Sequence, residues 1–166
     1  ANISIKNSKF SGQHIDVIVK DTSDLKAEAK GLTVGAVAAG AIISKANNEG
    51  VADIEIEKST FNKDEAIGKD ITIKAERGRR VTANSQGASV GAVAGAGIIA
   101  NAKDTGKAEV RVKKEKGQSI FQANKVNMEA HNKMKVTAEA KAVTASIIGG
   151  VGITKSEAIS AGKTMV

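Results

Sequence analysis

The strongest constraint on the fold of this chain is an internal repeat at an offset of 56 positions. The segment from Thr33 to Ala38 matches the segment from Ser89 to Ala94 at five of six positions, and the match continues without a gap. A degenerate third copy lies at an offset of 111 positions, where Val136 to Lys141 is similar to Leu25 to Lys30. Similarity at a fixed period is typical of proteins in which one structural unit stacks on the next.

The repeats cover the whole chain and predict a single domain-like segment over residues 1–166. Its approximate subdivisions are 1–24 (partial), 25–80, 81–135 and 136–166 (partial). Ala1 is not an initiator methionine and no signal peptide is visible, so we expect this chain to be a fragment of a longer protein.

A finer period lies inside the large one. Stretches of strand character begin at nearly regular intervals, near Ile15, Thr33, Ala52, Ile71, Ser89, Ala108, Val126 and Val143. Several of them alternate apolar and polar residues, as in Ile54-Glu55-Ile56. The pattern predicts an all-β fold, a parallel β-helix (β-solenoid) with about 18–19 residues per coil and about eight or nine coils. At roughly 4.8 Å per coil the rod would be about 40 Å long.

This coil length makes a prediction about the repeats. Equivalent residues of two repeats would be separated by three coils, or about 14 Å, and would not touch. Glu55 and Arg111, which are equivalent, are then expected to face water and not to form an ion pair. A Ser-x-Phe triplet also recurs, and it contains all three phenylalanines of the chain: Phe10, Phe61 and Phe121.

The hydrophobic composition favours a thin, layered core. Hydrophobic residues make up 41% of the chain, yet there are only three Phe and no Trp or Tyr. The core must therefore consist mainly of Val, Ile and Ala, stacked in rows of like side chains from coil to coil. The absence of Cys excludes disulfides and thiolate metal sites.

A left-handed helix of the hexapeptide acyltransferase type has a coil of similar length. It requires an aliphatic residue at every sixth position. Steps of six from Val34 reach Gly40, Ala46 and Ala52, so the pattern is absent and this architecture is disfavoured.

Two uncharged runs, Gly31 to Ile43 and Ala88 to Ala100, are rich in Ala and Gly. They are shorter than the roughly 20 residues of a transmembrane helix. We favour strands that are buried on both faces, where small residues permit close packing. The alternatives are a helical hairpin that packs through Gly91 and Gly95, and a surface that becomes exposed and inserts into membranes.

Motifs for catalysis, cofactors and metals are weak. The G-x-G-x-x-A pattern from Gly95 to Ala100 is lost in the equivalent part of the first repeat. His14 and His131 are far apart in the sequence and form no recognisable catalytic motif. Three carboxylates alternate along one strand, at Asp53, Glu55 and Glu57, and we expect them to be solvated and not to bind Ca²⁺. We therefore expect no enzyme activity and no catalytic, cofactor or metal site.

The formal net charge of +7 favours anionic partners such as acidic glycans or lipid headgroups. Nucleic acid is disfavoured as a partner because single-strand binders rely on aromatic stacking, and this chain has almost no aromatic residues. One basic cluster falls in a predicted turn and a second runs off a predicted strand. A solvated charge run is the alternative to anion contact at both. The candidate anion or host-surface contacts are Arg77, Arg79, Arg80, Arg111, Lys113, Lys114 and Lys116.

The segment from Val34 to Ile43 and its copy from Val90 to Ile99 resemble the large bacterial exoproteins of the filamentous-haemagglutinin type. These are exported by two-partner secretion or as autotransporters. The Lys-rich composition without Pro or Cys is most similar to that of the fusobacterial leukotoxins and related adhesins. The resemblance implies a right-handed parallel β-helix, a secreted or bacterial cell-surface location and a role in virulence. It transfers no functional residue.

The expected function is that of a structural and binding segment of such an exoprotein, a leukotoxin or adhesin that contacts the host-cell surface. Its other partners would be the neighbouring repeats of the same chain, and strand edges left free at the ends would favour end-to-end association. One alternative is a membrane-active toxin segment that uses the Ala/Gly runs. A β-helix enzyme acting on polysaccharides is less favoured, because wall aromatics for sugar stacking are missing.

Overall fold

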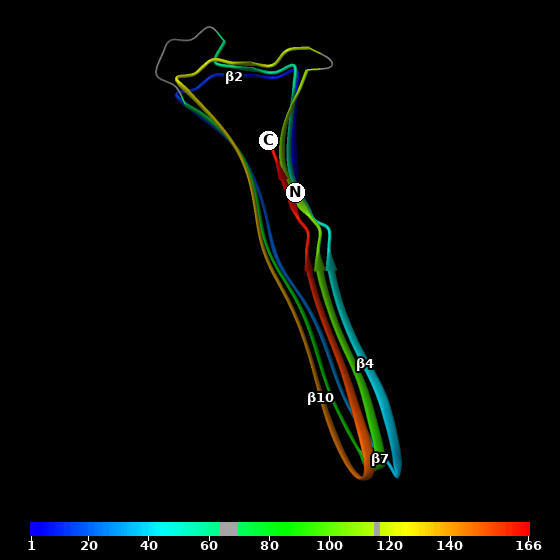
Figure 1. Ribbon diagram of the computed structural model, residues 1–166. Coiled ribbons are helices and arrows are strands. Elements are labelled where there is room, and N and C mark those ends of the chain that lie inside the picture. Colours follow the sequence, from blue (N-terminus) through cyan, green and yellow to red (C-terminus); the bar gives the residue numbers. More distant parts are fainter. Residues whose placement is uncertain (64–69, 115–116) are drawn as a thin grey trace.

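The computed structural model is an elongated blade that is broad at one end and narrow at the other (Figure 1). The structure describes residues 1–63, 70–114 and 117–166. Within these residues the regular structure is entirely β, and every strand pair is parallel. The strands are β1 (Asn2–Lys6), β2 (Lys9–Phe10), β3 (His14–Val34), β4 (Val37–Asn48), β5 (Val51–Glu57), β6 (Thr60–Phe61), β7 (Asp70–Asp104), β8 (Lys107–Lys113), β9 (Ile120–Phe121), β10 (Lys125–Ser160) and β11 (Lys163–Met165).

The described strands form three parallel sheets. One has the order β1-β5-β8-β11, a second has the order β2-β6-β9, and in the third β7 pairs with β10, β3 and β4. The two long strands β7 and β10 bend back on themselves at the narrow end, as Figure 1 shows, and β3 and β4 meet at the same place. We name three layers: the first layer is β1 to β4, the middle layer β5 to β7 and the third layer β8 to β10. This arrangement is compatible with a β-solenoid.

The spacing of paired residues differs from the sequence prediction. Paired residues are 51 to 60 positions apart, from Asn2 beside Asp53 to Thr60 beside Ile120. In the described part of the chain, no strand pairs with the next strand along the sequence. The prediction that one coil contains about 18–19 residues and stacks on the next such coil is therefore wrong. The period of about 18–19 residues instead separates successive stretches of strand within one layer. Strands of different layers pair at the spacing of the long repeat, which is about 56 residues.

The core lies in two parts along the blade. Toward the broad end it is built mainly of Ile and Val, including Ile54, Ile71 and Val110. Toward the narrow end its centre is Val81 surrounded by alanines such as Ala83. Alanine side chains fill less width than isoleucine, so the two long sides approach each other toward the narrow end. The expectation of a thin core of Val, Ile and Ala is confirmed.

Like side chains stack from layer to layer in the core. Ile15 pairs with Ile71, which pairs with Val126 on its other side. The predicted aliphatic rows are therefore present, but they join residues of different long repeats and not of successive short coils. The prediction that equivalent residues of the repeats do not touch is wrong.

The Ser-x-Phe triplets form a stack across the three layers at the broad end. The ring of Phe61 lies between those of Phe10 and Phe121, with centroid separations of 5.0 and 4.8 Å. The backbone N–H of Ser59 donates to the Ser119 hydroxyl at 3.3 Å, which repeats the bond from the Ser8 N–H to the Ser59 hydroxyl at 3.2 Å. The triplet thus recurs because each copy contacts the next.

Replacing Phe61 by leucine is expected to lower the free energy of unfolding by about 2 kcal/mol, because the buried ring loses two stacked neighbours. Phe10 has one stacked neighbour and is 36% exposed, so Phe10→Leu should cost about half as much. Urea denaturation followed by circular dichroism measures both changes. Equal losses for the two variants would contradict the stacked arrangement.

Candidate functional site

The narrow end of the blade carries an apolar surface that we name the apolar tip. It consists of residues 31–43 of the first layer, 88–100 of the middle layer and 142–154 of the third layer, and none of these residues is charged. The chain reverses direction here in every layer (Figure 1). The apolar tip therefore joins segments that are far apart in the sequence.

Outward-facing side chains of the apolar tip are strongly exposed. Val37 is 78% exposed in the first layer and Ile147 is 92% exposed in the third. In the middle layer, which has a layer on each side, Val90 and Val93 remain 41% and 45% exposed. Alternate residues such as Ala94 are buried. The prediction that the Ala/Gly runs are buried on both faces is wrong, as is the helical-hairpin alternative, because the runs are strands with one exposed face.

Glycines on the inner face make the tip thin. A Cβ atom at Gly31 would lie 2.7 Å from Cδ1 of Ile42, and one at Gly87, which adjoins the tip, would lie 2.5 Å from the same atom, so the two sides of the blade meet with no room for a side chain. The polar side chain of Ser89 inside the tip is satisfied within the chain, since its hydroxyl donates to the Ala38 carbonyl at 3.1 Å. Small residues thus fill much of the interior of the tip, while many larger aliphatic side chains point to solvent.

Small and aliphatic residues continue in register across the layers on both faces of the tip. One face of the tip is formed by β3 and the strand segments paired with it (the β3 face), and the other by β4 and its paired segments (the β4 face). On the β3 face the outward rows are Leu32, Ala88 and Val143, then Val34, Val90 and Ala145. On the β4 face they are Val37, Val93 and Gly149, then Ala39, Gly95 and Val151, then Ala41, Gly97 and Ile153.

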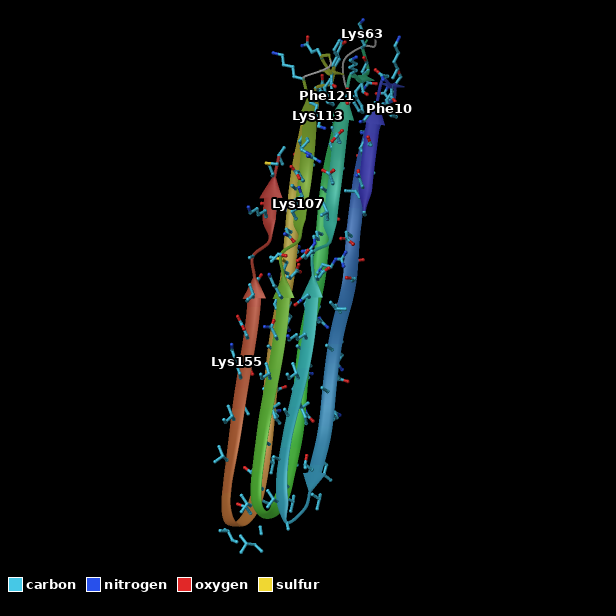
Figure 2. The ribbon with its side chains drawn as sticks, turned by 90° about the vertical axis from the view of Figure 1, so that its right-hand side faces the viewer. Phe10, Lys63, Lys107, Lys113, Phe121 and Lys155 are labelled. Carbon is cyan, nitrogen blue, oxygen red and sulfur yellow. The ribbon has the colours of Figure 1, made fainter. Side chains whose placement is uncertain are left out.

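Lysines border the apolar tip on both faces. Along the β3 face the first charged side chains are Lys30 in the first layer and Lys141 in the third, in one row with Gln86. Along the β4 face they are Lys45 and Lys155, and Figure 2 shows Lys155 on the outer side of the blade above the narrow turn. A shallow groove with Lys30, Lys141 and Leu32 in its lining marks the border on the β3 face.

The first predicted basic cluster lies inside β7 and not in a turn. Arg77 is fully buried, with its guanidinium donating to Asp104 Oδ1 at 2.5 Å and to Asn132 Oδ1 at 3.0 Å. Arg79 is largely buried and pairs with Asp21. Arg77 therefore contacts groups of its own chain and cannot reach an external anion, whereas Arg80 is exposed.

These arginines belong to a polar cluster between the two parts of the core, in which Arg77 and Asp104 are buried and the other members are half-buried. We define it as Asp21, Asn48, Arg77, Arg79, Asp104 and Asn132. Burial alone would raise the pKa of Asp21, but the hydrogen bond from Arg79 and its positive charge lower that pKa below the usual value. The polar cluster is thus a structural feature held together by charge pairing.

The second predicted basic cluster is paired with carboxylates of the neighbouring layer. Arg111 donates to Asp53 Oδ2 at 2.9 Å and lies 3.7 Å from Glu55, while the Lys113 ammonium lies 2.9 Å from Glu55. The prediction that Glu55 and Arg111 do not form an ion pair is therefore wrong. Lys114 is exposed, and Lys116 lies outside the described residues.

Carboxylates with lowered pKa values make stability depend on pH. The hydrogen bond from Lys113 lowers the pKa of Glu55, and that from Lys74 lowers the pKa of Glu76, both from an ordinary value of 4.5. Each pair then stabilises the fold above pH 4.5, and this contribution is lost as pH falls through the lowered pKa. We expect the melting temperature to fall as the pH drops below 4.5, as measured by circular dichroism.

Glu55→Gln should reduce that fall, because its charge is absent at every pH. The matched control is Glu49→Gln, at an exposed position between β4 and β5, which should leave the fall unchanged. A melting temperature that stays constant down to about pH 3 would contradict the paired arrangement.

The structure also tests the remaining candidates. No group of three or more His, Asp or Glu side chains comes together for a metal ion among residues 1–63, 70–114 and 117–166. His131 lies 2.8 Å from Glu129 on one strand, and His14 lies 4.0 Å from Asp70. In the same part of the chain there is no helix with the length and apolar character needed to span a membrane.

Comparison of the chain with protein-family models, curated proteins and solved structures finds no match.

Proposed function

We propose that this chain is a structural and binding segment of a secreted or cell-surface bacterial exoprotein, built as a right-handed β-solenoid. The observation that carries the proposal is the register of the layers, in which each long repeat pairs along its length with the next. Such units extend a rod by simple addition, and their stability comes from contacts between neighbours. A rod of this kind holds a binding surface away from the bacterium.

An added repeat tests the solenoid. A chain in which residues 51–106 are duplicated in tandem should fold with one further layer and lengthen along the stacking axis by about 4.8 Å. Small-angle X-ray scattering measures the length, and thermal unfolding should show equal or higher stability. Aggregation or loss of cooperative unfolding would argue against stacking by addition.

The proposed partner is the surface of a host cell, through an acidic glycan or a membrane, in a virulence role as leukotoxin or adhesin. The net charge of +7 supports an anionic partner, and Arg80 and Lys114 are exposed members of the predicted basic clusters. Arg111 and Lys113 keep this contact role as well, because their side chains are 37% and 42% exposed beside their ion pairs.

Binding of the labelled chain to leukocytes and to epithelial cells tests this role, at low and at physiological salt. Saturable binding to one cell type would support a receptor, and death of the bound cells would place toxic activity in this segment. Binding that disappears at physiological salt on every cell would leave the segment a stalk and contradict its role as a contact surface.

A further inference from the structure

The apolar tip is the most unusual surface of the described structure. It presents aliphatic side chains to solvent on two opposite faces and at the turn that joins them, as at Leu32, Val37 and Ile148, which are 67%, 78% and 78% exposed. Soluble proteins rarely expose a continuous apolar surface without an interaction partner. Around the narrow turn in Figure 2 the side chains are small and mostly carbon.

The composition of the tip favours lipid over a protein partner. Protein interfaces concentrate their binding energy in Trp, Tyr and Arg, and residues 31–43, 88–100 and 142–154 contain none of these. The tip is also exposed on both faces, so a protein partner would need a deep cleft to cover it. A bilayer covers both faces of a thin wedge without any matching shape.

The charged border supports the same partner. The first charged side chains on each face are lysines, Lys30 and Lys141 on one and Lys45 and Lys155 on the other. Lysines at the edge of an apolar surface bury their methylene groups and keep the ammonium at the level of the lipid headgroups.

Backbone hydrogen bonding limits how deeply the tip can enter. In the middle layer β7 pairs with strands on both sides except at the turn around Gly91 and Ala92, so most of its N–H and C=O groups are satisfied in an apolar medium. The outer edges of β3, β4 and β10 are not paired within the described residues, and burying them in hydrocarbon is costly. The expected depth is therefore the boundary between headgroups and acyl chains.

We propose that the apolar tip inserts shallowly into the surface of an anionic lipid bilayer, with the bordering lysines on the headgroups. The proposal rests on the function proposed above, since it names the surface through which the segment contacts its target.

Flotation with vesicles tests the partner. The whole chain should bind vesicles of phosphatidylcholine with phosphatidylserine more tightly than vesicles of phosphatidylcholine alone. Leu32→Asp combined with Ile148→Asp should weaken binding about tenfold or more, because two exposed aliphatic anchors are lost. The matched control combines Ile18→Asp with Ile120→Asp, exposed aliphatic residues away from the tip that are 42% and 37% exposed. It makes the same change in net charge and should weaken binding much less.

A fluorescent label tests the depth. The described chain contains no cysteine, and a side chain at Gly149 would meet no atom within 4 Å, so Gly149→Cys places a single environment-sensitive dye on the tip. Its emission should shift to the blue with anionic vesicles. The same dye on Ser11→Cys, at the exposed broad end, should show no shift.

Three results would overturn the proposal. They are no binding to anionic vesicles, equal loss for the two double variants, and a blue shift that depends on protein concentration without vesicles, which would indicate tip-to-tip association of two copies. These outcomes leave the added-repeat and cell-binding results untouched, so the proposed function can stand when the lipid proposal fails. Conversely, loss of cooperative folding in the added-repeat chain leaves the vesicle result with the natural chain valid.

Discussion

Replacing Arg77 by alanine is expected to destabilise the protein by about 3–5 kcal/mol, because the substitution leaves a buried carboxylate without its counter-charge. The side chains of Arg77 and Asp104 are both 0% exposed, and the guanidinium also donates to Asn132. Asp104 is left with the N–H of Gly106 and the amide of Asn48, which do not neutralise its charge. Urea denaturation followed by circular dichroism measures the loss.

Two further variants separate burial from charge. Lys155→Ala removes an exposed ion pair with Glu157 and should change the stability by less than about 0.5 kcal/mol. Replacing both buried partners together, Arg77→Met with Asp104→Leu, should restore most of the stability lost in Arg77→Ala, because no charge then stays buried. If Arg77→Ala costs no more than Lys155→Ala, the pair is not buried in solution.

Replacing Gly106 by alanine is expected to destabilise the protein by about 3 kcal/mol. A Cβ atom at Gly106, between β7 and β8, would overlap the guanidinium of Arg77 and the carbonyl oxygen of Gly50, between β4 and β5. Neither can move freely, because one is backbone and the other is fixed by its buried ion pair. The connection around Gly50 must then move away from that around Gly106, and thermal unfolding reports the cost.

The matched control is Gly97→Ala, at a position inside β7. A Cβ atom there would approach no atom closer than the Gly40 carbonyl oxygen, at an ordinary contact distance of 3.9 Å. Alanine also reduces the freedom of the unfolded chain, so this variant should be neutral or slightly stabilising. Equal losses at Gly97 and Gly106 would show that loss of glycine, and not the close contact, is responsible.

The all-β fold and the composition of the core could be predicted from the sequence, whereas the pairing distance could not. Polar stretches such as Asp21 to Asp24 and Arg77 to Arg80 have the composition of turns. In the structure they continue through long strands, because Asp21 of β3 pairs with Arg79 of the neighbouring strand β7. These partners are 58 positions apart, and local patterns carry no information about such a contact.

The candidate site was only partly predictable for a related reason. In the Ala/Gly runs the outward residues are mainly Val, Ala and Gly and many inward residues are of the same types, so alternation along the strand shows little contrast. The exposed face of Val90 and Val93 therefore has no clear signal in the sequence. The absence of charge along each run, beside lysines, was the available signal for an exposed apolar surface.

The spacing between paired residues also sets how this chain folds. The first strand pair joins Asn2 to Asp53, and no shorter pairing in the described chain offsets the entropy of closing that loop beforehand. Nucleation is therefore slow and depends on forming two layers together. Once two layers have formed, the next repeat can pair with their unpaired strand edges, and it gains contacts as each of its residues becomes ordered. We expect a long lag before the first two layers form and rapid growth afterwards.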